Sequence, residues 1–205
     1  SRNRLVDSLR EMGIKSEKVL EVIRTVPRHL FVDEALASRA YENTALPIGY
    51  GQTISQPYTV ALMTEALYDS GSMKKVLEIG IGCGYQTAVL AQVSRLVFGV
   101  ERVKGLFVRT DKRLRALKIL NTRLKHGDGF EGWAANASYD AILVAAAPVS
   151  LPSKLIDQLS LGGRLVIPVG RSGKQELRMY VKKAKGVEEE CLERVSFVPL
   201  LDGLR

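Results

Sequence analysis

The segment from Val76 to Gly84, VLEIGIGCG, constrains the fold more than any other part of the sequence. A short apolar run ends there in three glycines at alternate positions, and an amphipathic stretch, 85–93, follows at once. This order predicts a strand, a tight turn and a helix. Glycine has no Cβ and tolerates positive φ, so such a turn can bend sharply and approach a ligand closely. The free amides of the helix start, at the carboxyl ends of parallel strands, suit a nucleotide-like cofactor.

Apolar runs alternate with helical patterns after residue 74, which predicts an α/β fold. Strands are expected at 75–79, 96–100, 139–145 and 164–169, with helices at 85–93 and at 152–159, the latter ended by Gly162 and Gly163. Such alternation builds a parallel sheet with right-handed crossovers. Two further strand-like runs, 177–183 and 191–200, are separated by 185–190 without a helix, so they predict an antiparallel pair at the edge of the sheet.

The part of the chain before residue 70 has a helical pattern interrupted by one loop-like segment. Helices are expected at 4–12, 16–26 and 57–69, with a loop at 43–57. In the first two helices the apolar residues recur at helix spacing, and Gly13 and Pro27 mark where they end. Glycines, prolines and few charges are typical of a loop, and Pro57 is well tolerated in the first turn of the third helix.

The length and composition indicate one domain without a membrane span or a metal site. The chain has 205 residues, 46% of them hydrophobic, which is enough for one buried α/β domain and short for two. We expect a single domain over 1–205, with N-terminal helices and a binding loop in 1–56, the cofactor-binding core in 57–170 and antiparallel strands in 171–205. No run of about 18 apolar residues occurs, and the charged start does not resemble a signal peptide, so we expect a cytoplasmic protein. Cysteines and histidines are too few and too scattered for a zinc site.

Positive charge is concentrated in one window. Lys and Arg outnumber Asp and Glu by 30 to 22, and segment 102–125, with nine basic residues and one acid, carries the whole excess of eight. A basic patch of this kind can bind nucleic acid. Aromatic residues for base stacking do not interleave with the charges, so we favour a solvated helix face with four side chains turned inward: Leu106, Phe107, Leu114 and Leu117. Both interpretations stay open on the sequence alone.

The glycine turn departs from the dinucleotide fingerprint G-x-G-x-x-G. Its third glycine comes one residue early, and Tyr85 stands where the fingerprint requires glycine. Glu78 would repel a pyrophosphate but could pair with a cationic amino group, while Glu101 closes the second strand, where an acid can hold ribose hydroxyls. The pattern E-x-G-x-G-x-G over 78–84 resembles the first motif of class I S-adenosylmethionine-dependent methyltransferases. This resemblance implies S-adenosylmethionine as the cofactor, whereas a ligand-free turn with a surface Glu101 is the alternative.

The segment 49–57, GYGQTISQP, resembles the G-x-x-x-T-I-S-[QA]-P hallmark of the protein-L-isoaspartate O-methyltransferases. Further matches to this family occur in order along nearly the whole chain: PRHLF at 27–31, GDG at 127–129, YDAI at 139–142 leading to AAP at 146–148, GGRL at 162–165 and FVPL at 197–200. AAP also stands where amino-methylating DNA and RNA enzymes carry Asn/Asp-Pro-Pro-aromatic. The resemblance implies a doubly wound, Rossmann-like, mainly parallel seven-stranded sheet, in the order 3-2-1-4-5-6-7 with one reversed strand, an antiparallel C-terminal edge and an N-terminal helical extension.

The family resemblance implies a protein-repair enzyme. It would transfer a methyl group to the free α-carboxylate of L-isoaspartyl residues in aged proteins, with D-aspartyl residues left open, and the ester would collapse to a succinimide. A carboxylate has a pKa of roughly 3.5–4 and is already ionised at neutral pH, so the reaction needs positioning rather than a general base. We therefore assign no catalytic role to His29 or His126. The expected partners are damaged proteins or peptides, with no membrane, no stable nucleic acid and a monomeric enzyme.

The same resemblance assigns roles to individual residues. Ser55 is the expected catalytic residue, which orients the substrate carboxylate, with Thr53, Ile54 and Val198 in the same substrate site. The expected cofactor-binding residues are Glu78, Gly80, Gly82 and Gly84 at the methionine portion, Glu101 at the ribose, and Asp128 and Gly129 at the adenine. Each polar assignment has a structural alternative, because Ser55 suits a helix N-cap and Asp128 suits a turn between two glycines.

Three other functions stay open. An rRNA or tRNA methyltransferase would use the basic segment 102–125 and show salt-sensitive RNA binding. A domain that only senses S-adenosylmethionine would bind it without turnover and would be unaffected by Ser55→Ala. An NAD-dependent oxidoreductase is disfavoured by Tyr85 at the third glycine position of the fingerprint.

Overall fold

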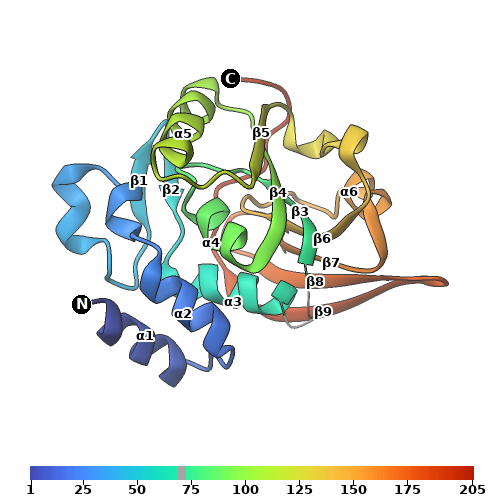
Figure 1. Ribbon diagram of the computed structural model, residues 1–205. Helices are drawn as coiled ribbons and strands as arrows, with labels where there is room; N and C mark the ends of the chain where they lie inside the picture. The colour runs from blue at the N-terminus through green and yellow to red at the C-terminus, as the bar shows by residue number, and fades with distance from the viewer. Residues whose placement is uncertain (69–72) are drawn as a thin grey trace.

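A twisted sheet runs through the middle of the molecule, with helices on both of its faces (Figure 1). This computed structural model describes residues 1–68 and 73–205. The helices are α1 (Arg2–Glu11), α2 (Glu17–Thr25), α3 (Pro57–Tyr68), α4 (Tyr85–Val93), α5 (Lys104–Ala116) and α6 (Ser153–Asp157). The expected helices agree with these to within a few residues, and the predicted end of the third, Asp69, lies outside the described residues.

The main sheet has seven strands. They are β3 (Met73–Ile79), β4 (Ser94–Glu101), β5 (Thr122–His126), β6 (Tyr139–Val144), β7 (Leu159–Val169), β8 (Gln175–Lys183) and β9 (Gly186–Val195). Their order is β5-β4-β3-β6-β7-β8-β9, and only β8 runs against its neighbours. Numbered within this sheet, the order is 3-2-1-4-5-6-7 with one reversed strand, so the predicted fold class is confirmed.

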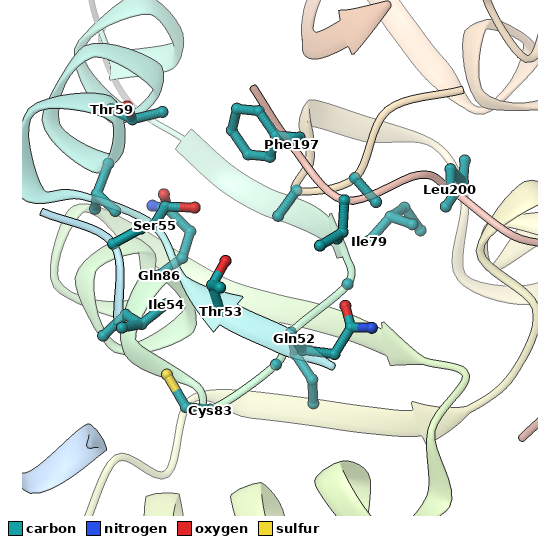
Figure 2. Close-up of a pocket in the computed structure, with 18 of the residues that line it drawn as sticks. Gln52, Thr53, Ile54, Ser55, Thr59, Ile79, Cys83, Gln86, Phe197 and Leu200 are labelled. Carbon is teal, nitrogen blue, oxygen red and sulfur yellow. The ribbon is translucent and has the colours of Figure 1, made fainter. Parts of the chain in front are cut away.

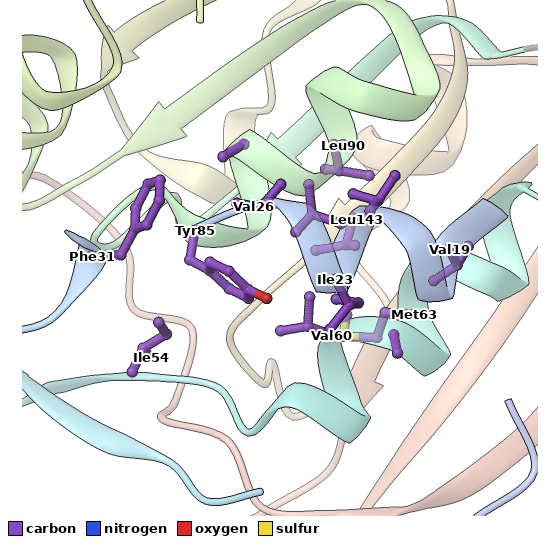
Figure 3. Packing of buried hydrophobic residues seen from close by; sticks show 14 of the residues in the cluster. Val19, Ile23, Val26, Phe31, Ile54, Val60, Met63, Tyr85, Leu90 and Leu143 are labelled. Carbon is purple, nitrogen blue, oxygen red and sulfur yellow. The ribbon is translucent and has the colours of Figure 1, made fainter. Parts of the chain in front are cut away.

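Alternate residues of the central strands enter two separate cores. Val76, Val97 and Leu143 belong to the core beneath α1 to α5, whereas their neighbours in sequence, Leu77, Phe98 and Val144, belong to the core on the opposite face beside α6. Figure 3 shows the first core, where Tyr85 of α4 packs among side chains of α2 and α3. Both faces are buried because the strands are parallel and helices cover each side, which explains their nearly continuous apolar sequences.

The expected loop 43–57 is wrong in part, because it contains a second, two-stranded antiparallel sheet. Strands β1 (Leu46–Gly49) and β2 (Gln52–Ile54) pair with Leu46 opposite Ile54. Three consecutive residues at the turn, 49–51, have positive φ, which two glycines accommodate easily. Short 3₁₀ helices, η1 (Arg28–Phe31) and η2 (Glu34–Arg39), precede this hairpin. The hairpin places residues 52–55 beside the carboxyl ends of the central strands (Figure 2).

Three other expectations need correction in the C-terminal half. Strand β5 had no counterpart among the expected strands, because its sequence, TRLKH, is charged and only partly buried at the sheet edge. Gly162 and Gly163 do not end a helix but lie inside the long strand β7. Strand β9 covers 186–195 rather than 191–200, so its four glutamates lie on an exposed edge strand, where charge is tolerated. Segment 197–200 lies outside β9: Pro199 forms an isolated bridge with Ala147, and the backbone of Phe197 is hydrogen-bonded to the side chain of Gln175 in β8.

Two results concern features absent from the described ranges 1–68 and 73–205. No helix there is long and apolar enough to cross a membrane. No group of three or more His, Cys, Asp or Glu side chains there could hold a metal ion.

Candidate active site

A cavity of about 710 Å³ opens at the carboxyl ends of β3, β4 and β6. Its walls are the glycine turn after β3, the β1–β2 hairpin with the residues that follow it, and segment 193–201 (Figure 2). In Figure 2, Thr53 and Ser55 lie on one side, with Phe197 and Leu200 across from them. The volume is within the range of about 300–1,000 Å³ that is usual for small-molecule sites. This is where parallel α/β sheets bind their ligands.

The glycine turn forms the floor of the cavity. Gly80, Gly82 and Gly84 have φ values of +82°, +52° and +90°, which favour glycine at all three positions. Gly80 and Gly82 line the cavity. Gly84 begins α4 and faces α5 instead, because a Cβ there would lie 2.7 Å from Cγ2 of Thr110. The three glycines thus divide into two that leave room for a ligand and one that allows close helix packing.

Glu101 presents a fixed carboxylate at the tip of β4. Its side chain lines the cavity although only 5% of the residue is exposed. The amide of Gly82 donates to Oε2 and the amide of Val103 to Oε1, both at 3.0 Å. Each oxygen keeps a lone pair for a further donor, so the carboxylate can accept hydrogen bonds from ribose hydroxyls without moving.

Glu78 lies behind the turn rather than in the cavity wall. It is completely buried, and the hydroxyl of Thr87 in α4 donates to its Oε2 at 2.7 Å. Burial, with a smaller contribution from the nearby charge of Glu101, raises the pKa of Glu78 to about 8. This geometry suits a side chain that joins β3 to α4 and steadies the turn. A direct contact of Glu78 with the cofactor stays a prediction.

Asp128 and Gly129 differ in position. Gly129 lines the cavity, and a Cβ there would lie 2.5 Å from Cγ2 of Ile79, so only glycine fits. The Asp128 carboxylate accepts the amide of Phe130 at 2.9 Å and that of Gly203 at 2.8 Å. It thus serves as the cap of a short 3₁₀ helix, η3 (Gly129–Glu131), and also ties down the segment near residue 203. Its expected contact with adenine stays a prediction.

The expected substrate residues all belong to the cavity wall. Thr53, Ile54, Ser55 and Val198 all line it. Val198 is fixed there because its carbonyl accepts the amide of Ala147 at 2.8 Å. Their roles in binding and catalysis stay predictions.

The Ser55 hydroxyl has no hydrogen-bond partner among the described residues. The role of a cap for α3 falls to Asn43, whose Oδ1 accepts the amide of Tyr58 at 2.9 Å. The hydroxyl of Ser55 is therefore available to a ligand.

Several lining residues were not singled out from the sequence. Gln86 lines the cavity, and its Nε2 donates to the buried hydroxyl of Thr64 at 2.9 Å, which fixes the side chain. Gln52, Thr59, Phe197 and Leu200 line it as well (Figure 2). Gln86 lies in the first turn of the helix that follows the glycine motif, which is the signal that could have identified it. The other four come from segments whose approach to the cavity depends on the tertiary fold.

The two histidines stand outside the cavity wall. Nδ1 of His29 lies 2.8 Å from the hydroxyl of Tyr41, and Nε2 of His126 lies 2.9 Å from the carbonyl of Arg102. His126 also stacks on Phe107. Both are engaged in local packing.

Comparison with protein families and relatives gives one consistent result. The family model described as protein-L-isoaspartate(D-aspartate) O-methyltransferase matches residues 1–205. A protein-L-isoaspartate O-methyltransferase of Halorhodospira halophila is 54% identical over 203 residues, covering 99% of this chain and 92% of that protein. A relative of the same name, numbered 1, from Nitrosococcus oceani is 56% identical over 201 residues, covering 98% and 94%.

Solved structures agree with this result. One protein-L-isoaspartate O-methyltransferase superposes with a TM-score of 0.89 at 27% identity, covering 100% of this chain and 67% of that one. A Plasmodium falciparum chain assigned to the same enzymes, crystallised with S-adenosyl-L-homocysteine, superposes with a TM-score of 0.83 at 28% identity, covering 97% of each chain.

Proposed function

The chain belongs to the protein-L-isoaspartate(D-aspartate) O-methyltransferase family, and we propose that it methylates the free α-carboxylate of isoaspartyl residues in damaged proteins. The observation that carries the proposal is one cavity whose wall includes both the glycine turn with Glu101 and the segment Thr53 to Ser55. A cofactor and a peptide carboxylate can therefore meet in a single enclosed space. The resulting ester closes to a succinimide, which reopens in part to normal aspartate.

The residues present fit S-adenosylmethionine, the cofactor of this family. Gly80 and Gly82 line the cavity floor without side chains, and a Cβ on Gly82 would also press on Cδ1 of Ile48 at 3.2 Å. Glu101 supplies two carboxylate oxygens where a ribose would lie, and Gly129 leaves space for a flat ring. We assign Gly80, Gly82, Glu101 and Gly129 to direct contact, and Glu78, Gly84 and Asp128 to holding these groups in place. When bound, this cofactor supplies a methyl group made electrophilic by a sulfonium.

The chain's own contribution is binding, orientation and exclusion of water. Ser55 donates a hydrogen bond to one oxygen of the substrate carboxylate and leaves the other oxygen free to react. Ile54 and Val198 supply apolar walls that shield the carboxylate from solvent, and Thr53 adds a polar group at the rim. No base is required, since the carboxylate is ionised at neutral pH. Correct orientation of two reactants can lower a barrier by about 7–11 kcal/mol in the best cases.

The basic segment 102–125 offers limited support for the alternative of RNA methylation. Six of its nine cations are engaged within the molecule in the described part of the chain: Arg102, Arg109, Arg113 and Arg123 with backbone carbonyls, Arg115 with Asp111, and Lys125 over the ring of Trp133. Leu106 and Leu114 are buried beneath this face, and Phe107 and Leu117 are partly buried. We propose that the face stabilises α5 and forms no stable complex with nucleic acid.

We further propose a monomer that works in the cytoplasm. Both edges of the main sheet carry charged side chains, on β5 and on β9, which disfavour pairing between copies. Cys83 is buried, Cys191 is exposed, and neither forms a disulfide, as suits a reducing compartment.

The proposal is tested by methyl transfer from labelled S-adenosylmethionine to two synthetic peptides that differ only in an isoaspartyl or a normal aspartyl residue. Base-labile label on the isoaspartyl peptide alone is the expected result. Label on neither peptide with the cofactor still bound would overturn it. Methylation of RNA in a parallel reaction would point instead to a nucleic-acid enzyme, and cofactor binding without any turnover would point to a sensor.

A further inference from the structure

Arg28 joins three separate segments of backbone around the substrate end of the cavity. The residue lies in η1 and is completely buried. Its Nε donates to the carbonyl of Ala40 at 2.8 Å, and its Nη2 donates to the carbonyls of Ser55 at 2.8 Å and Thr44 at 3.3 Å. One guanidinium therefore fixes the backbone of Ser55, which lines the cavity.

The charge of Arg28 has no acidic partner in the described ranges of the chain. Its Nη1 and the hydroxyl of Tyr85 are both buried without a well-formed hydrogen bond there, although the two groups interact and each moves the pKa of the other. The guanidinium lies 4.8 Å from the centre of the Tyr85 ring, whose face offers partial compensation. Burial lowers the pKa of Arg28, which expresses the cost of placing a cation in this environment. A buried charge usually acquires a counter-charge, so this side chain is incompletely balanced.

The residues that contact the Arg28 side chain include two that line the cavity. Ser55, which accepts its hydrogen bond, and Tyr85, whose ring it covers, both line the cavity, whereas Arg28 does not. Figure 3 shows the Tyr85 ring between Phe31 and the apolar side chains of Ile23 and Val60. An anion that enters in front of Ser55 would therefore face a cation across a single layer of side chains with little intervening water, where electrostatic attraction is strong.

We propose that Arg28 is a positioning residue for the substrate: it holds the Ser55 segment in place, and its charge is balanced when the isoaspartyl α-carboxylate binds. This inference rests on the proposed function. The cofactor brings a second carboxylate, on its methionine portion, but Arg28 makes no hydrogen bond to the glycine turn 80–84 among the described residues. The cation bonded to that turn is Arg113, whose Nη1 donates to the carbonyl of Cys83 at 2.7 Å. The charge of Arg28 also acts on Cys83 in the turn, but all its hydrogen bonds run to Ala40, Thr44 and Ser55, and these favour the substrate end.

A guanidinium suits this position better than an ammonium does. Its planar fork donates simultaneously to Ala40 and Ser55, whereas a lysine offers a single point of charge. Arg28→Lys keeps the charge and loses the fork, and Arg28→Gln loses both. We expect the KM for the isoaspartyl peptide to rise about tenfold in Arg28→Lys and on the order of a hundredfold in Arg28→Gln, with a smaller change in kcat, since hydrogen bonds to charged groups are among the strongest.

The test measures the KM for the isoaspartyl peptide, the Kd for S-adenosylhomocysteine and the melting temperature in both variants. KM does not depend on how much of the enzyme is folded, so it reports on the site even in a destabilised variant. Leu20→Ala is the matched control, because Leu20 is buried in α2 and lies outside the cavity wall. It should lower the melting temperature and leave KM unchanged. We expect the KM for the isoaspartyl peptide to be higher than the wild-type value in Arg28→Lys and higher still in Arg28→Gln. The Kd for S-adenosylhomocysteine should be unchanged in both variants.

Two outcomes would overturn the inference while the wild-type enzyme still methylates the isoaspartyl peptide. One is wild-type KM in Arg28→Lys and in any folded Arg28→Gln. The other is weaker binding of S-adenosylhomocysteine in the variants with unchanged binding of methylthioadenosine, which lacks the carboxylate. That pattern would show that Arg28 balances the carboxylate of the cofactor rather than that of the substrate. Should Arg28→Gln fail to fold, Arg28→Lys alone decides. Failure of the proposed function itself is separate, since it appears as no methylation by the wild type.

Discussion

At the scale of single residues, ligand binding and capping of helix α3 fall to two different side chains, Ser55 and Asn43, although a serine just before a helix could do both. The hydroxyl of Ser55 faces the cavity without a partner among the described residues, while Asn43 caps α3 through the amide of Tyr58. A side chain that serves a ligand and a side chain that serves the fold can therefore be tested independently.

Ser55→Ala should reduce kcat/KM for the isoaspartyl peptide by about 10- to 100-fold, because a hydrogen bond to a charged group contributes roughly 1.5–3 kcal/mol. Its free energy of unfolding should change by less than about 0.5 kcal/mol. Asn43→Ala is the converse control, with a loss of about 1 kcal/mol of stability from the missing cap. Peptide kinetics and urea unfolding of both variants are the measurements. Full activity in Ser55→Ala would remove its assigned role.

Glu78 makes the stability of the protein depend on pH in an unusual direction. Burial raises its pKa from 4.5 to about 8 in the folded state. Between these values the folded protein binds more protons than the unfolded chain, so stability falls as pH rises from about 4.5 through 8. Glu78→Gln removes this titration and can keep a hydrogen bond to Thr87. We expect it to be more stable than the wild type at pH 8 by on the order of a few kcal/mol. Urea unfolding between pH 5 and 9 checks this, and parallel pH curves for the two proteins would contradict it.

At the scale of elements, the contact between α4 and α5 depends on Gly84. Its φ is +90°, and an added Cβ would lie 2.7 Å from Cγ2 of Thr110. Thr110 cannot move freely, since its hydroxyl donates to the carbonyl of Gly82 at 2.6 Å. The tight turn and the helix pair are therefore fixed together.

Gly84→Ala should destabilise the protein by about 3 kcal/mol, since it adds steric overlap to the strain of a left-handed alanine, which alone costs about 1–2 kcal/mol. Gly162→Ala is the matched control, because its φ is +79° but no atom lies within 4 Å of an added Cβ. That variant should show the strain cost alone. Urea unfolding measures both, and equal losses would show that contact with Thr110 has no effect.

The elements also show which parts of the structure can be predicted from sequence. The glycine turn and the strands around Val76 and Ile142 can be predicted because they carry local signals: both strands are apolar runs, and the first is ended by glycines. Strand β5 cannot be predicted in this way, because its pairing depends on the neighbouring strand β4 rather than on its own charged sequence. The hairpin β1–β2 has the sequence pattern of a loop, because strands of four and three residues are too short to show a period of two.

The candidate site follows the same division between local and distant signals. Gly80, Gly82, Ser55 and Glu101 belong to motifs, and all four line the cavity. Gly129 lines the cavity, whereas its neighbour Asp128 is bonded to the amide of Gly203, 75 residues away, and its contact with adenine stays a prediction. Sequence patterns do not reveal a contact between residues so far apart in the chain.

At the scale of the whole molecule, the two cores share one sheet. The N-terminal helices pack into the core beneath α3 and α4. The single tryptophan, Trp133, packs on the opposite face, where its ring meets that of Phe98 edge-on with 5.4 Å between the ring centres. Alternate residues of each central strand belong to each core, so disruption of one face removes support from the other. We therefore propose that residues 1–205 fold as a single cooperative domain.

The proposed single domain predicts coincident unfolding transitions by two probes. Trp133 fluorescence reports the core beside α6, and far-ultraviolet circular dichroism reports all helices, so both should give one midpoint in urea. Leu9→Ala truncates a fully buried side chain of α1. It should lower the free energy of unfolding by about 2–5 kcal/mol and shift both urea midpoints down equally. S-adenosylhomocysteine at 100 times its Kd should raise the free energy of unfolding by about 2.7 kcal/mol and shift both urea midpoints up together. If Leu9→Ala shifts the dichroism and leaves the Trp133 midpoint at the wild-type value, the N-terminal helices unfold as a separate unit.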